Sequence, residues 1–165
     1  MPQRKFPSMA ILPFLSLTFL LCSCGSRQPQ AETSAVSATE VNEPFASFSE
    51  DLQSSVKSLE FRPGQSMVVP VTLRNTGSTT WASAGKYPVT ISYKWFDRGK
   101  QLPIEGERTL FPRAVKPGES VDVPVKVTAP QSGTDLVVKI CLVQEGVAWF
   151  LSAGAKPLEI PVTVR

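Results

Sequence analysis

The chain has 165 residues, with 17 Lys and Arg, 14 Asp and Glu, and no His. This length fits one folded domain of ordinary size behind an N-terminal export segment, and the small excess of positive charge gives no indication of a nucleic-acid partner. Because His is absent, Ser-His-Asp and Cys-His catalysis and His-based zinc sites are excluded, and the sequence predicts no catalytic residue, no metal site and no cofactor.

The N-terminal residues have the pattern of an export signal. Arg4 and Lys5 give a positive start, and an apolar run follows from Met9 to Leu21. A run of about 13 residues is too short for a hydrocarbon layer that needs about 20, so a permanent transmembrane helix is the weaker alternative. The pattern predicts a signal peptide over residues 1–23.

The signal ends in a cysteine motif. Leu21-Cys22-Ser23-Cys24 resembles the lipobox of bacterial lipoproteins, in which an aliphatic residue stands three positions before the modified cysteine and a small residue directly before it. Cys22 fits less well, because the bulky Leu21 precedes it. The resemblance implies cleavage before Cys24, a diacylglyceryl group on its sulfur, and a fatty acid such as palmitate on the new amino terminus. The alternative is an ordinary secretory signal in which the cysteines are incidental.

The same resemblance implies a place in the cell. Several acyl chains anchor a protein firmly in a membrane, whereas a single chain binds only marginally. Gly25 follows the cysteine, and in bacterial lipoproteins the absence of Asp at that position usually means export to the outer membrane. In a two-membrane cell we therefore expect a lipid-anchored protein of the cell envelope, held at the outer membrane and facing the periplasm.

Residues 24–53 are predicted to comprise the lipidated cysteine and a flexible linker. They are mostly Ser, Ala, Thr, Glu, Gln and Pro, with few large apolar side chains before Phe45 and Phe48. Such a composition cannot form a core. As a coil, the segment would hold the domain on the order of 25 to 30 Å from the membrane, so we expect it to act as a spacer.

From residue 54 to residue 165 the sequence has the periodicity of β-strands. Apolar residues recur at every second position, for example from Met67 to Leu73, so each strand has one buried face. The pattern predicts an all-β domain over residues 54–165, an immunoglobulin-like antiparallel β-sandwich of about seven strands. The expected strands lie near residues 56–61, 66–75, 88–96, 101–105, 119–128, 135–144 and 158–164, with a weak strand near Thr109.

Two further patterns bear on strand position. Residues 136–143 are apolar on both faces except for Lys139, which predicts a central strand. Pro70, Pro124 and Pro161 each remove a donor from the hydrogen-bond ladder, so we expect them at sheet edges or bulges. Pro70 is the difficult one, because the second strand of such a sandwich is normally central.

Several motifs in order carry a family resemblance. They are Arg74-Asn75-Thr76-Gly77 followed by Trp81, and then Pro88–Trp95, Pro117-Gly118-Glu119 and Leu142–Phe150. These motifs resemble the four-tryptophan, immunoglobulin-like domains of selective autophagy receptors and related bacterial domains. The resemblance covers residues 54–165 and implies an interaction or accessory module without a shared reaction. The chain departs from the family pattern in having only three tryptophans.

The aromatic residues allow two interpretations. In the first they are structural, and Trp81 and Trp149 fill the open end of the sandwich. In the second, Trp81, Trp149 and Phe150 are partly exposed and form a stacking platform for sugar rings or for an apolar side chain of a partner. Arg74 and Glu145 would then supply the polar contacts of the platform.

The charged residues and the third cysteine add little chemistry. Glu145 and Arg108 either form a charge pair or are independent surface charges. No pair of acidic residues indicates a glycosidase cleft. Cys141 has no intrachain partner once Cys24 carries lipid, and we expect it to be a small buried side chain.

Together these observations favour a non-enzymatic binding or scaffold lipoprotein of the bacterial envelope, attached to the membrane by its N-terminal lipid and recognising a protein or a polysaccharide. Two alternatives stay open. One is a purely structural envelope lipoprotein, and the other is an accessory subunit of a sugar-modifying or polysaccharide-export system.

Overall fold

The computed structural model describes residues 40–165. The predicted signal peptide, Cys24 and the rest of the predicted linker up to residue 39 lie outside the described residues. Within the part of the chain that the structure describes, no helix is long and apolar enough to cross a membrane.

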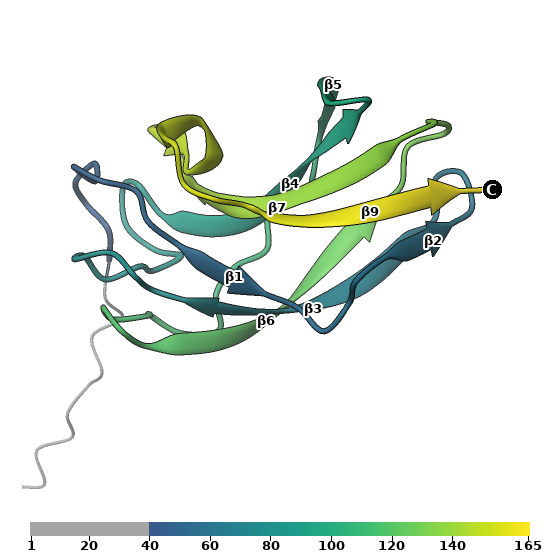
Figure 1. The fold of residues 1–165 in the computed structure, drawn as a ribbon. Coiled ribbons are helices and arrows are strands. Elements are labelled where there is room, and N and C mark those ends of the chain that lie inside the picture. Colours follow the sequence, from purple (N-terminus) through teal and green to yellow (C-terminus); the bar gives the residue numbers. More distant parts are fainter. Residues whose placement is uncertain (1–39) are drawn as a thin grey trace, which may run out of the picture. The chain divides into compact units, whose positions relative to one another are not determined.

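Two β-sheets packed face to face make up the domain (Figure 1). The strands are β1 (Asp51–Gln53), β2 (Leu59–Phe61), β3 (Ser66–Arg74), β4 (Val89–Asp97), β5 (Lys100–Glu105), β6 (Ser120–Thr128), β7 (Leu136–Gln144), β8 (Ala148–Trp149) and β9 (Leu158–Val164), with one 3-10 turn, η1 (Leu151–Ala153). One sheet has the order β1-β3-β6, and the other has the order β2-β9-β7-β4-β5, with β8 paired to β7. β2 runs parallel to β9, and the other neighbours are antiparallel. The predicted all-β, immunoglobulin-like sandwich is confirmed.

The alternating sequences place one face of each sheet in the core. Along β3, the buried Val69, Val71 and Leu73 alternate with exposed residues, and β6, which pairs with β3 along its whole length, repeats the pattern. β7 lies between β9 and β4, so the prediction of a central strand over residues 136–143 is confirmed. β4 is buried on both faces over most of its length, because other parts of the chain cover its outer side.

Pro70 and Pro161 lie in β3 and β9, strands that have neighbours on both sides along part of their length. Pro70 lies in β3 beyond the last pair with β1, at Thr72. Pro161 lies in β9 just before the first pair with β2, at Val162. Each proline therefore lacks a strand neighbour on one side, where its missing N–H costs no ladder hydrogen bond. The expectation of an edge therefore holds locally at these two prolines, although β3 and β9 are interior strands elsewhere, and Pro124 lies in the edge strand β6.

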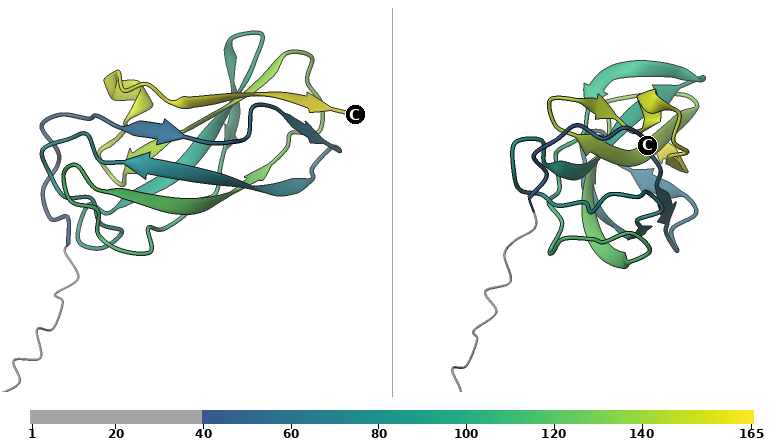
Figure 2. Two further views of the ribbon diagram at one scale, coloured as in Figure 1. Left: turned by 60° about the horizontal axis from the view of Figure 1, so that its bottom comes forward. Right: turned by 90° about the vertical axis from the view of Figure 1, so that its left-hand side faces the viewer.

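The domain begins earlier than the sequence indicates. Residues 41–50, which we call the strap, lie against the sandwich and continue into β1, which pairs with β3 (Figure 2). Val41 is 4% exposed, and Phe45 and Phe48 pack against the core. The predicted linker-to-domain boundary at residue 54 is therefore wrong. The strap has only three large apolar residues, and Pro44 and polar or small residues separate them, so its composition indicated a linker.

A glycine allows the start of the strap to dock. The amide of Val41 donates to the carbonyl of Ala84 at 2.9 Å, and the amide of Tyr87 donates to the carbonyl of Val41 at 2.8 Å. Gly85 lies between these contacts with a φ of 99°, and a Cβ there would lie 2.5 Å from the carbonyl oxygen of Val41. Only glycine combines this positive φ with such a close approach of two backbones.

Candidate functional site

Two residues of the hypothetical stacking platform lie in the core. Trp81 is 2% exposed and Phe150 is fully buried. Their ring centroids are 5.9 Å apart in a T-shaped arrangement, and Phe48 of the strap lies edge-on to Phe150 at 4.9 Å. We call Phe45, Phe48, Trp81 and Phe150 the end cluster. The platform hypothesis is wrong for Trp81 and Phe150, because neither ring is accessible to a ligand.

Asn75 gives the Arg-Asn-x-Gly motif a structural role. Its side chain is buried, and Nδ2 donates to the carbonyls of Thr79 at 2.9 Å and Val115 at 2.8 Å, while Oδ1 accepts from the amide of Gly77 at 2.9 Å. Trp81 and Val115 also exchange two backbone hydrogen bonds, of 3.0 and 2.8 Å. Asn75 therefore joins the two segments that place the Trp81 ring in the end cluster.

Trp149 lies on the opposite side of the chain from its neighbour Phe150. After β7 the chain turns at Glu145 and Gly146, where Gly146 has a φ of 73°, and returns as β8 alongside β7. The amide of Phe150 donates to the carbonyl of Leu142 at 2.9 Å, which extends this pairing by one residue. β8 ends at Trp149, and Phe150 has the αR backbone that leads into η1. Phe150 thus enters the end cluster, and Trp149 remains partly exposed on the outer face of the sheet.

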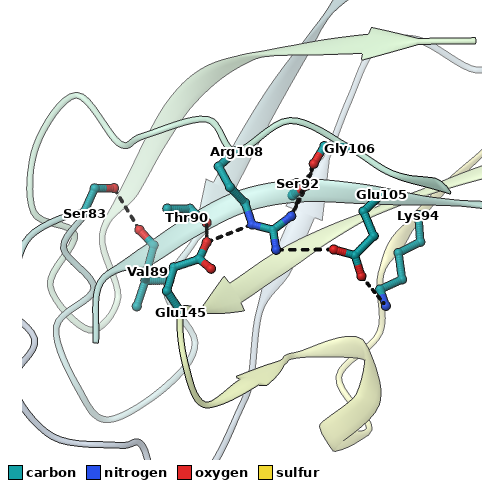
Figure 3. Close-up of polar contacts among 9 residues, drawn as sticks. All are labelled: Ser83, Val89, Thr90, Ser92, Lys94, Glu105, Gly106, Arg108 and Glu145. Carbon is teal, nitrogen blue, oxygen red and sulfur yellow. Dashed lines mark hydrogen bonds and ion pairs between the residues drawn. The ribbon is translucent and has the colours of Figure 1, made fainter. Parts of the chain in front are cut away.

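Arg108 lies at the centre of a polar network over the outer face of β4 and β7 (Figure 3). Its Nε donates to Oε1 of Glu145 at 2.8 Å, and its Nη2 lies 3.6 Å from Oε2 of Glu105. Its Nη1 donates to Oγ of Ser92 and to the carbonyl of Gly106, both at 3.2 Å. The sequence left open whether Arg108 and Glu145 are paired, and the structure shows that they form an ion pair.

β4 supplies the buried part of this network. Thr90, Ser92 and Lys94 occupy alternate positions on the outer face and are at most 8% exposed. Thr90 Oγ1 donates to Oε1 of Glu145 at 2.6 Å, and Lys94 Nζ lies 3.5 Å from Oε1 of Glu105. Polar groups can be buried here because each has a partner. We call the following side chains the Arg108 network: Thr90, Ser92, Lys94, Glu105, Arg108 and Glu145.

Two cations of the network hold the indole of Trp149. Lys94 Nζ lies 4.3 Å and Arg108 Cζ lies 4.6 Å from its ring centroid. A cation over an aromatic face contributes about 0.5 to 1 kcal/mol at an exposed site. The ring is therefore oriented before any ligand arrives, and the charges around it are balanced by Glu105 and Glu145. We call Trp149 together with the Arg108 network the Trp149 face.

The structure brings together only part of the predicted site. Trp149 and Glu145 meet on the Trp149 face, Trp81 and Phe150 are buried, and Arg74 is exposed on β3 in the other sheet. Lys94 and Glu105 also belong to this face but were not among the residues expected from the sequence. A signal for Lys94 was present in V-T-I-S-Y-K-W, where polar residues alternate along β4, but a solvated sheet face gives the same alternation.

The acidic side chains of the Trp149 face are paired with Arg108, and the cysteine of the described domain is buried. Among the described residues, no group of His, Cys, Asp and Glu side chains could hold a metal ion. Cys141 is free and buried on β7, and burial raises the pKa of its thiol to about 12, which leaves no reactive thiolate at neutral pH. Both Glu105 and Glu145 are engaged by Arg108. What remains available to a ligand is an oriented indole with hydrogen-bonding groups at its rim.

Comparisons with known proteins do not assign the chain to a family. No protein-family model matches it, and no curated protein matches it. Among solved structures, it is similar to Spo0M, a sporulation control protein from Bacillus subtilis, with 13% identity and a TM-score of 0.41. That match covers 73% of this chain and 50% of the Spo0M chain, so it spans about half the length of that protein.

Proposed function

We propose that this protein is a lipid-anchored, non-catalytic binding module of the bacterial cell envelope, which recognises a protein or a polysaccharide through its Trp149 face. The lipobox-like Leu21-Cys22-Ser23-Cys24 supports the anchor. The resemblance of the later motifs to four-tryptophan domains supports a role in binding, because those domains are interaction or accessory modules.

The observation that carries the proposal is the orientation of Trp149. A large aromatic ring, partly exposed and fixed by two cations at 4.3 and 4.6 Å, loses little conformational entropy when a ligand stacks on it. Trp and Arg are also the residues that contribute most to binding energy at protein interfaces. The side chains of Arg108 and Glu145, 32% and 31% exposed, can donate and accept hydrogen bonds at the edge of the ring.

Site-specific crosslinking in intact cells tests the binding face. A photo-crosslinking residue replaces Val147, which is 38% exposed beside Trp149, and in a matched control replaces Val68, which is 61% exposed on β3 of the other sheet. We expect crosslinked partners, identified by mass spectrometry, from position 147 but not from position 68. Adding Trp149→Ala should abolish them, and Trp149→Phe should retain part of them.

A glycan array with the purified mature chain completes that test by asking whether the partner is a polysaccharide. Failure of both the array and the crosslinking would contradict a binding function and favour the purely structural alternative. Crosslinks that persist unchanged in Trp149→Ala would place recognition on another surface.

Metabolic labelling with palmitate tests the anchor separately. We expect Cys24→Ala to remove the label and to release the protein from the membrane fraction, because the acylated amino terminus forms only after cleavage at the lipidated cysteine. Cys22→Ala is the matched control and should keep both the label and the membrane association. Label retained in Cys24→Ala would show that the cysteine is wrongly assigned.

A further inference from the structure

Glu50, at the end of the strap, completes the hydrogen bonding of a strand that it does not belong to. The pairing of β9 with β7 begins at Leu158, opposite Ile140, and the pairing of β8 with β7 begins at Val143. Between these two partners the amide of Leu142 donates instead to Oε2 of Glu50, at 2.8 Å. The Glu50 side chain thus replaces a missing strand partner along one side of β7.

The other carboxyl oxygen of Glu50 has no partner. Oε1 is inaccessible to solvent and makes no hydrogen bond to any described residue. Asp51 on β1 and Lys156 and Glu159 near the start of β9 line the groove beside Glu50, and the Cys141 thiol of β7 lies close enough to feel its charge. No ion pair joins Glu50 to any of these groups in the described chain. A negative charge on this oxygen would be shielded from solvent and uncompensated.

Burial therefore favours the neutral acid. It raises the pKa of Glu50 from 4.5 to about 8, against the smaller opposite effect of the hydrogen bond from Leu142. A protonated carboxyl can still accept that hydrogen bond through its carbonyl oxygen. When the strap leaves the sandwich, the carboxyl enters water and returns to its ordinary pKa.

We propose that Glu50 makes the docking of the strap pH-dependent, so that the strap is held most firmly in acid and loosens as the pH rises. The docked form binds one proton more than the undocked form in the interval between the two pKa values, about 4.5 and about 8. In that interval the docking equilibrium constant falls by up to roughly tenfold per pH unit. Below it both forms are protonated, above it both are ionised, and the dependence disappears.

The strap has other attachments, which the release of residues 41–50 must also break. Gln144 is buried at the end of β7, where its Oε1 accepts from the amide of Phe45 and its Nε2 donates to the carbonyl of Glu43, both at 2.9 Å. If the anchoring proposed above holds, release of residues 41–50 adds up to roughly 35 Å to the connection between membrane and domain. The pH dependence itself rests on neither the anchor nor the binding face.

Hydrogen exchange of the mature full chain measures the docking directly. The amides of Val41 and Tyr87, which bond the strap to the loop before β4, are followed from pH 5 to pH 9 after correction for the intrinsic exchange rate. We expect their protection factors to fall up to roughly tenfold per unit between pH 5 and pH 8 in the wild type. Glu50→Gln, which is neutral and of the same shape, should remove this slope.

Two further variants serve as references for this experiment. Glu43→Gln removes an exposed carboxyl from the same strap and should keep the wild-type slope. Gly85→Ala brings a methyl group against the backbone of Val41 and should lower the protection of the strap at every pH. A wild-type protection that does not change between pH 5 and pH 8, or a Glu50→Gln slope equal to that of the wild type, overturns the proposal.

A measurement on the wild type covers the case in which Glu50→Gln does not fold. Carbon-13 NMR of the assigned Glu50 carboxyl should give a titration midpoint near 8, and a midpoint near 4.5 overturns the proposal. These results are independent of palmitate labelling and of crosslinking at position 147, so failure of the strap proposal and failure of the proposed function are distinguishable.

Discussion

The end cluster and the Trp149 face are built from adjacent residues but have opposite surroundings. Phe150 is fully buried and touches only other parts of the domain, including Trp81 and Phe48. Trp149, one residue earlier, lies under two cations and remains partly exposed. The comparison teaches that two adjacent aromatic residues can have opposite surroundings, because β8 ends at Trp149 and the chain turns into η1 at Phe150.

The largest expected effect comes from removing the centre of the end cluster. Phe150→Ala leaves a cavity among three other aromatic rings and should lower the free energy of unfolding by about 3 to 5 kcal/mol. Trp149→Ala should cost about 1 kcal/mol, since its ring is partly exposed and loses mainly cation–π contacts. Urea denaturation at fixed pH compares the two variants. Equal losses would contradict the division between a buried core ring and a partly exposed ring.

A somewhat smaller effect is expected at Asn75, which positions Trp81. Asn75→Ala leaves the amide of Gly77 and the carbonyl of Thr79 without their side-chain partner and removes one of the two hydrogen bonds to the carbonyl of Val115, so we expect a loss of about 2 to 3 kcal/mol. Asn75→Asp keeps the acceptor for Gly77 but removes both donated bonds, and is the matched control. If urea denaturation gave the alanine variant wild-type stability, the buried hydrogen bonds would not be what holds the Trp81 segment.

The smallest of these effects concerns the Arg108 network. Because the side chains of Arg108 and Glu145 are about one-third exposed, solvent screens their ion pair, and Arg108→Ala should lower stability by only about 1 kcal/mol. The same variant removes one of the two cations that lie over the Trp149 ring. We expect a change in tryptophan fluorescence and a loss of the position 147 crosslinks. Arg108→Lys, which keeps the charge but not the forked geometry, should be intermediate. A fluorescence spectrum identical to that of the wild type would show that Arg108 does not orient the ring.

Much of the fold could be predicted from local patterns. The alternation of apolar residues in β3 and β6 and the two-sided apolar run in β7 identified these strands and the central position of β7, because periodicity records which faces are buried. The two-residue strand β8 and the three-residue β1 were missed, since segments so short have no measurable period. Their pairing depends on partners far away in the sequence.

The candidate site was less predictable for the same reason. Arg108 and Glu145 are separated by 37 residues, and only the stacking of the Glu105–Arg108 segment over β4 decides that they pair. Arg74 and Glu145 looked equally suited to a binding surface, but the order of the strands places them in different sheets. The local sequence around a charged residue does not predict which sheet its strand joins.

By itself, the sequence determined the all-β character of the domain, and it predicts an export signal ending before Cys24, because both give short-range patterns of hydrophobicity. Only the tertiary structure decided that the strap belongs to the sandwich, that Trp81 and Phe150 are core while Trp149 is not, and that the carboxyl of Glu50 is buried. These properties depend on contacts such as that between Glu50 and Leu142, 92 residues apart. Burial and hydrogen bonding at such distances arise only when the two sheets close on one another.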